Sequence, residues 1–167
     1  LDSGFVSASI ITIIFGVLFF LSNLDHNKTI DLPQAFILTA LSWLSIAIFG
    51  SLPFIFSSLN LSFTDAFFES MSGITTTGST ILTDLDNAPK GILLWRAILQ
   101  WLGGIGIILM AITLMPIMNI GGMQLFKISA NDNAEKILPK SKEVSLRLIV
   151  IYTILTLVCA FFYKMFG

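Results

Sequence analysis

The residues Leu61–Thr80, LSFTDAFFESMSGITTTGST, carry the hydroxyl and carbonyl oxygens from which an ion site is built. The second part, Ile74–Thr80, has three successive threonines and a glycine but no charged side chain. Stripping water from a cation in low dielectric costs roughly tens of kcal/mol, so a permeation path must supply replacement oxygens. Uncharged oxygens suit a weakly held monovalent ion, whereas a carboxylate cage indicates calcium or magnesium. The pattern predicts monovalent-cation coordination, with an ordinary Ser/Thr/Gly-rich surface loop as the alternative.

A short helix is predicted directly before these oxygens. Ser62 followed by Asp65 has the spacing of an N-cap with an acid in the first turn, so the helix should begin near Phe63. Phe63, Phe67 and Met71 recur at four-residue spacing, which predicts that this apolar side packs against the flanking segments. We expect Gly73 to end the helix, and its negative C-terminal end then favours a cation.

The backbone beyond this helix is expected to present oxygens. The three threonines favour an extended conformation, because branching at Cβ stiffens the side chain. Gly78 permits a backbone conformation that aims carbonyls along one axis, where a Cβ would obstruct it.

Composition predicts a membrane protein. With 55% hydrophobic and 11% charged residues among 167, the chain has more apolar surface than a soluble domain of this size can bury. Four segments are apolar enough to cross a bilayer, and they must be helical because lipid offers the backbone no hydrogen-bond partners. These segments are Phe5–Leu21, Gln34–Phe56, Gly91–Met118 and Val144–Phe166. The predicted fold class is therefore all-α integral membrane, a helical bundle.

Charge sets the expected orientation and excludes other classes. Gly121–Arg147 is rich in Lys and Arg and should face the cytoplasm, whereas Ser57–Lys90 is acidic and should face outward. The formal charge of −1, without a clustered basic surface, argues against a nucleic-acid partner. No Ser-His-Asp set and no histidine cluster is present in the sequence, so neither an enzyme nor a cofactor is predicted.

Two features of the third apolar segment have alternative interpretations. Arg96 is interpreted first as an interfacial anchor, with a charge that tunes a pore mouth as the alternative. Gly103, Gly104 and Gly106 are interpreted as sites of close helix packing, with a hinge as the alternative.

The order of these motifs resembles a known family. An apolar segment, LSFTDAFFES, SGITTTGST and then WRAILQWLGGIGIILMAITLMP resemble the first membrane–pore–membrane repeat of the Trk/Ktr potassium-uptake family, and in particular its TrkH-like pore-forming subunits. The resemblance implies a re-entrant pore helix and a filter loop, as in potassium channels. It implies that Thr76 and Thr77 give carbonyls to potassium, that Thr75 flanks them, and that Gly78 is the filter glycine.

The resemblance also implies a domain organisation. It comprises an accessory transmembrane helix at 1–24, a first repeat at 25–120 (outer helix 33–57, pore helix 63–73, filter 74–80, inner helix 91–119), a cytoplasmic connector at 121–143, and the first helix of a truncated second repeat at 144–167. The implied location is the bacterial inner membrane, multi-pass. The implied partners are membrane lipid, the remaining repeats of the same polypeptide, a second copy in a homodimer, and a cytosolic nucleotide-binding regulatory subunit.

One departure from the family pattern is large. A single filter loop is present where the resemblance implies four, so we infer a fragment of a longer pore subunit. The alternatives are a complete small homotetrameric cation channel and a non-conducting membrane assembly subunit. Channel and proton- or sodium-coupled symport both remain open.

Overall fold

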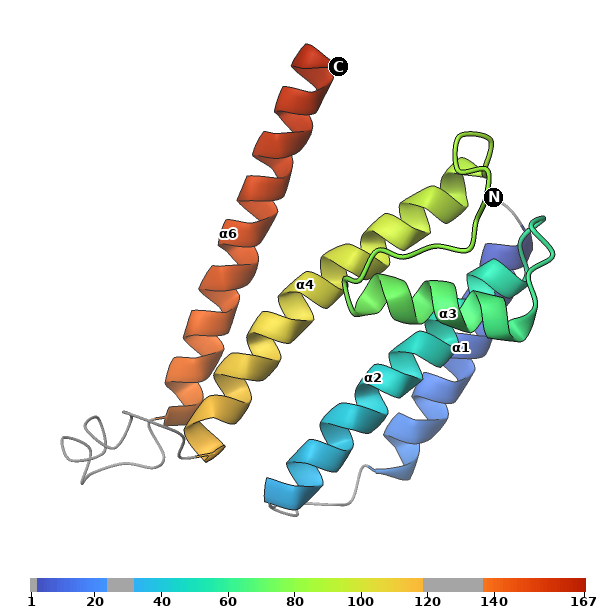
Figure 1. Cartoon of the computed structure of the whole chain (residues 1–167). Coiled ribbons are helices and arrows are strands. Elements are labelled where there is room, and N and C mark those ends of the chain that lie inside the picture. Colours follow the sequence, from blue (N-terminus) through green and yellow to red (C-terminus); the bar gives the residue numbers. More distant parts are fainter. Residues whose placement is uncertain (1–2, 24–31, 119–136) are drawn as a thin grey trace. The chain divides into compact units, whose positions relative to one another are not determined.

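The computed structural model describes residues 3–23, 32–118 and 137–167, and these ranges contain helices and no strand. The helices are α1 (Ser3–Ser22), α2 (Leu32–Ile55), α3 (Phe63–Ile74), α4 (Lys90–Met118) and α6 (Ile137–Phe166) (Figure 1). The chain divides into two units, Leu1–Gly104 and Ile105–Gly167, and α4 begins in the first and ends in the second. Most of the predicted connector at 121–143 lies outside the described residues.

The prediction of four membrane-crossing helices is confirmed by their length and composition. They are Gly4–Ser22, Pro33–Ile55, Lys90–Ala111 and Glu143–Phe166. Their large apolar side chains are mostly exposed, as in Leu18, Leu41 and Leu157. A helix with this surface is stable in hydrocarbon, which satisfies the apolar side chains while the helix satisfies its own backbone.

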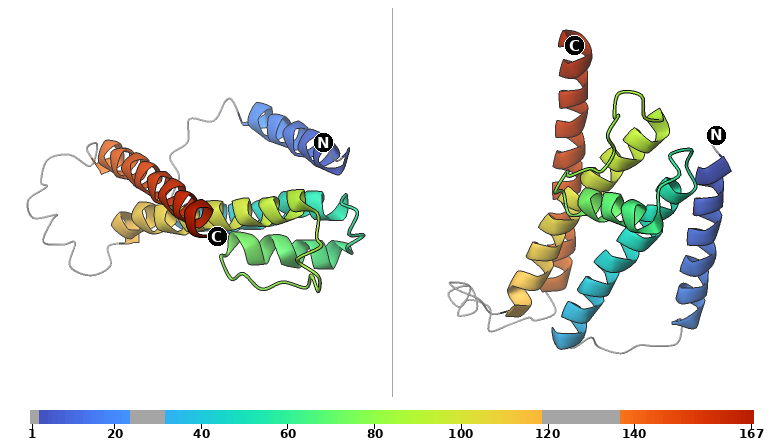
Figure 2. Two further views of the ribbon diagram at one scale, coloured as in Figure 1. Left: turned by 90° about the horizontal axis from the view of Figure 1, so that it is seen from above. Right: turned by 45° about the vertical axis from the view of Figure 1, so that its right-hand side comes forward.

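In the first unit, α3 is the short helix between two long ones. It contacts α2, and α2 also contacts α1. After α3 the chain turns back and passes alongside α3 toward the start of α4, as the views of Figures 1 and 2 show. Within this unit the beginning of α1 also contacts α4, because the Phe5 and Trp95 rings meet edge to face with centroids 6.3 Å apart.

Small residues allow α2, α3 and α4 to approach closely. A Cβ added at Gly50 of α2 would lie 2.5 Å from the Ser70 hydroxyl oxygen of α3, and one added at Gly73 would lie 3.1 Å from Leu99 Cβ of α4. A Cβ at Gly103 of α4 would overlap the backbone carbonyl of Ile74. The packing interpretation is thereby confirmed for Gly103.

The buried face of α3 differs from the predicted one. Its buried residues are Ala66, Glu69, Ser70, Ser72, Gly73 and Ile74. Of the side predicted to face inward, Phe63 is 59% exposed, whereas Phe67 and Met71 are half-buried. The prediction is wrong for Phe63 and holds only in part for Phe67 and Met71, because small side chains, and not large ones, permit the short distances to α2 and α4. Gly73 also does not end the helix, which continues to Ile74 and is capped by Thr75.

The predicted N-cap of α3 is confirmed. Ser62 is extended at φ −63° and ψ 160°, its hydroxyl oxygen accepts the Asp65 N–H at 3.2 Å, and its hydroxyl donates to the Asp65 carboxylate at 2.8 Å. The Ser62→Ala variant should lose about 1 kcal/mol of stability, because a first-turn N–H loses its acceptor. We expect a lower midpoint of thermal unfolding in detergent, whereas Ser62→Thr, which retains the hydroxyl, should unfold near the wild-type temperature. Equal midpoints for the alanine and threonine variants would contradict the capping role.

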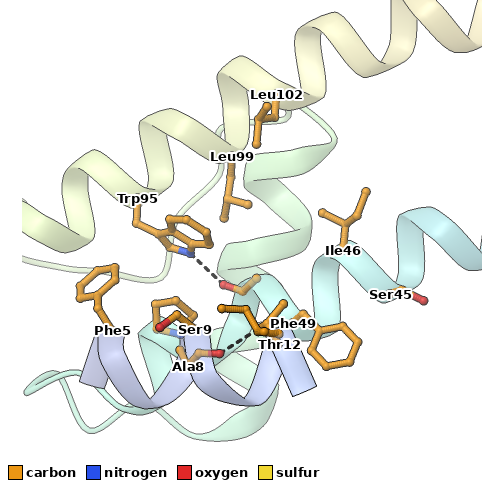
Figure 3. A pocket seen from close by; sticks show the side chains of 13 residues that line it. Phe5, Ala8, Ser9, Thr12, Ser45, Ile46, Phe49, Trp95, Leu99 and Leu102 are labelled. Atoms are coloured by element: carbon orange, nitrogen blue, oxygen red, sulfur yellow. Dashed lines mark hydrogen bonds between the residues drawn. The ribbon is translucent and has the colours of Figure 1, made fainter. Parts of the chain in front are cut away.

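A hydrogen bond from α4 to α2 joins two residues that line an apolar cavity. Trp95 Nε1 donates to the Gly50 carbonyl at 2.9 Å, as Figure 3 shows. The cavity has a volume of about 490 Å³ and is lined by α1, α2 and α4, with Ala8, Phe49 and Leu99 among its walls. The Thr12 hydroxyl beside it donates to the Ala8 carbonyl, so it is satisfied within α1.

The second unit contains the end of α4 and all of α6. In α6, Glu143 and Arg147 form an ion pair one turn apart, with side chains 62% and 73% exposed. Such exposed pairs contribute between about 0 and 1 kcal/mol. Cys159 of α6 is exposed.

Candidate ion-binding site

Residues 75–80, called the polar loop below, begin where α3 ends. Four successive backbone N–H groups point back to the last turn of α3. Thr75 donates to Met71 O at 3.0 Å, Thr76 to Gly73 O at 2.9 Å, and both Thr77 and Gly78 donate to Ser72 O, at 3.1 and 3.3 Å. The last turn of a helix otherwise leaves its carbonyls unpaired, so these bonds satisfy both partners. No donor in the described ranges reaches the carbonyl oxygens of residues 75–78.

The loop backbone is not a plain extended strand. Thr76 has φ +59° and Gly78 has φ +78°. The expectation of an extended threonine segment is therefore wrong at Thr76, because turning four N–H groups toward one helix end requires left-handed residues in between. Gly78 adopts such a conformation without strain, whereas Thr76 adopts it at a cost.

The predicted site residues Thr75, Thr76, Thr77 and Gly78 are consecutive and exposed. The Thr75 hydroxyl donates to Met71 O at 2.8 Å and lies 2.9 Å from the Thr77 hydroxyl. No charged side chain belongs to the loop, and among the described residues no group of three or more His, Cys, Asp or Glu is placed to hold a metal. The loop therefore offers uncharged oxygens only.

The far end of the loop is attached to α3 by two side chains. The Ser72 hydroxyl donates to the Ser79 carbonyl at 2.6 Å. The Glu69 carboxylate oxygen Oε1 accepts the Thr80 hydroxyl and the Ile81 N–H, both at 2.6 Å. The loop is thus fixed where it begins and where it ends.

Sequence reasoning missed the role of Glu69. Its side chain is 0% exposed, and its Oε2 lies 2.8 Å from Arg96 Nε of α4, at ion-pair distance but not in hydrogen-bond alignment. Glu69 is therefore not one of the acidic groups facing water, unlike the exposed Asp84 and Asp86. The signal available was Arg96 itself, because a charge inside an apolar span needs a partner.

The environment of Arg96 does not match its interpretation as an interfacial anchor. Its side chain is 12% exposed and faces Glu69. An anchor extends toward lipid head groups and water, whereas a side chain paired inside the protein stabilises contacts between helices.

The fold and the site together define a multi-pass helical membrane protein with an oxygen-lined loop held beside a short helix. The family model "TrkH: Cation transport protein" matches residues 2–166. The chain belongs to this family, whose members are transport proteins and not enzymes, and it is a multi-pass protein of the bacterial inner membrane.

Curated relatives agree with the family match. The chain is 46% identical over 134 residues to Trk system potassium uptake protein TrkI of Halomonas elongata, covering 80% of the chain and 27% of that protein. It is 40% identical over 162 residues to Trk system potassium uptake protein TrkH of Escherichia coli (strain K12), covering 94% and 33%. It is 40% identical over 167 residues to TrkH of Halomonas elongata, covering 98% and 35%. The chain thus spans about a third of the length of these relatives.

Proposed function

We propose that this chain carries one repeat of a potassium-uptake pore, with α3 as the re-entrant pore helix and residues 74–80 as the filter. In this proposal Thr75, Thr76, Thr77 and Gly78 form the ion path, and the carbonyls of Thr76 and Thr77 coordinate potassium. The observation that supports it most directly is the direction of the four N–H groups toward α3, which leaves the four carbonyls open.

The chemistry of the loop fits a potassium ion better than a divalent one. Backbone carbonyls replace the hydration shell of a monovalent cation without a fixed negative charge, so the ion is held weakly enough to leave. The C-terminal end of α3 adds a partial negative charge at the loop. Calcium or magnesium would be expected to require carboxylates, and Glu69 already accepts hydrogen bonds from Thr80 and Ile81 and forms an ion pair with Arg96.

One loop supplies oxygens on one side of an ion only. A complete shell therefore needs further loops, which we assign to the remaining repeats of a longer polypeptide. The relatives, about three times longer, are of a length that accommodates them. A homodimer and a cytosolic nucleotide-binding regulatory subunit complete the proposed assembly, and potassium is its cargo.

Rubidium flux tests this function directly. The natural gene product that contains this sequence, reconstituted in liposomes, should take up rubidium, and external potassium should compete better than sodium. Empty liposomes are the control. No flux above that control from folded protein would contradict the proposal and favour a non-conducting assembly subunit, whereas flux from residues 1–167 alone would favour a homotetramer.

A further inference from the structure

Glu69 connects three parts of the first unit through one carboxylate. The residue belongs to α3, its Oε1 accepts the hydroxyl of Thr80 and the N–H of Ile81, and its Oε2 faces Arg96 of α4. It is fully buried. No other described carboxylate is fully buried, and Asp65, Asp84 and Asp86 lie nearer the surface.

Burying the Glu69 carboxylate costs free energy of folding unless its contacts provide an interaction that an apolar side chain could not. An uncompensated buried charge is strongly destabilising, and replacing a buried ion pair by apolar residues is often neutral or favourable. Packing between α3 and α4 is already provided by Gly73, Leu99 and Gly103. The contacts peculiar to Glu69 are those to the loop, where a charged acceptor makes shorter and stronger hydrogen bonds than a neutral one.

The hydrogen bonds of Glu69 lie at the end of the polar loop, directly after the residues whose carbonyls are open. The start of the loop is set by backbone bonds to the last turn of α3. The end is set by Ser72 on Ser79 and by Glu69 on Thr80 and Ile81. Between these fixed points lie the strained Thr76 and the left-handed Gly78, which would relax if either end were released.

We propose that Glu69 is a positioning residue for ion selectivity, an inference that rests on the proposed function. Its carboxylate, itself held by Arg96, fixes Thr80 and Ile81 and thereby the spacing of the carbonyls before them. Glu69 does not contact the ion. Its loss therefore alters the preference for rubidium over sodium in the protein that folds, in addition to the folded protein lost because Arg96 is left unpaired.

Substitutions at Thr80 give the sharpest test, because they change the hydrogen bonds of the loop and leave both members of the Glu69–Arg96 ion pair in place. Thr80→Val has nearly the shape of threonine but lacks the hydroxyl, and Thr80→Ser retains it. In liposomes we expect Thr80→Val to lower the rubidium-over-sodium uptake ratio about tenfold, because Glu69 loses its hydroxyl donor and the Leu82 N–H loses the acceptor that this hydroxyl provides at 3.0 Å. Thr80→Ser should stay within about twofold of wild type on the same scale.

Glu69→Gln tests the carboxylate itself, with Glu143→Gln as the matched control. Both substitutions remove an acid that faces an arginine, but the Glu143 pair is exposed and distant in sequence from the loop. Glu69→Gln should lower the uptake ratio by about tenfold or more, and Glu143→Gln should leave it unchanged. All ratios are normalised to folded protein measured by size-exclusion chromatography in detergent. If Glu69→Gln does not fold, Thr80→Val decides.

The outcomes separate this inference from the function on which it rests. Selective wild-type flux with unchanged ratios in Thr80→Val and Glu69→Gln would overturn the role of Glu69 and leave the proposed function intact. Reduced folded protein at an unchanged ratio would assign Glu69 a structural role only. Absent wild-type flux would overturn the proposed function and this inference together.

Discussion

The Gly103→Ala variant of the natural gene product is expected to yield little folded protein. A Cβ at position 103 would overlap the carbonyl oxygen and carbon of Ile74. Both atoms belong to the backbone at the end of α3, so neither side-chain rotation nor a small adjustment relieves the overlap. Overpacking usually costs about 1–3 kcal/mol, and a backbone clash at a helix junction belongs at the upper end or beyond.

Folded yield and the midpoint of thermal unfolding in detergent measure this effect. Gly16→Ala in α1 is the matched control, because nothing lies within 4 Å of the added Cβ. That variant should be neutral or slightly stabilised, since alanine favours a helix over glycine by about 1 kcal/mol. Wild-type yield and midpoint for Gly103→Ala would show that α4 does not approach Ile74 so closely.

The Gly78→Ala variant is expected to fold but to lose ion preference. Gly78 has φ +78°, a conformation that costs an L-residue roughly 1–2 kcal/mol. Space is not the obstacle, because the nearest atom to an added Cβ is Gln100 Nε2 at 3.6 Å, an ordinary contact. The strain is local to the loop, and its release would rotate the peptide groups on both sides of residue 78.

Uptake ratios in liposomes measure this second effect. In the filter proposed above, rotated peptide groups would no longer present carbonyls to the ion, so we expect the rubidium-over-sodium ratio to fall at least about tenfold. Folded yield should remain near wild type, in contrast to Gly103→Ala. A wild-type ratio in Gly78→Ala would remove residue 78 from the ion path.

Local signals in the sequence predicted the helices and their ends well. The N-cap at Ser62 depends only on the serine side chain and the three residues after it, so it can be predicted without knowing the tertiary structure. The spans follow from length and apolarity, which lipid requires directly. The exceptions are the end of α3, where Gly73 was expected to stop the helix but instead faces Leu99, and the start of α6, which lies at Ile137 and not at the predicted Val144.

The buried face of α3 was not predictable from hydrophobicity. In water the apolar side of a helix is the buried one, so the pattern wrongly predicted that Phe63 is buried. In a membrane protein large apolar side chains are stable at the surface, and close packing selects small residues such as Ala66 and Gly73. Predicting the buried face of a helix therefore requires knowing first whether the helix lies in water or in lipid.

The anchoring of the loop was invisible for another reason. Glu69 and Arg96 lie on different helices, and only the fold shows that one pairs with the other. The left-handed backbone of Thr76 likewise follows from the direction of its neighbours' N–H groups and not from threonine's own preference. The ion pair thus required the fold, and at Thr76 the hydrogen bonds to the end of α3 outweigh the backbone preference of threonine.

The backbone N–H groups of residues 75–78 all donate to α3, and this affects how the loop treats halide ions and how it responds to pH. With the backbone N–H groups of residues 75–78 turned into α3, the backbone of the segment offers chloride no donor, and only threonine hydroxyls could replace its water. If the loop is the filter proposed above, the orientation of its peptide dipoles disfavours anions, and no side chain in the segment gains or loses a proton in the physiological range. In that proposed filter we expect the preference for cations over anions to be independent of pH.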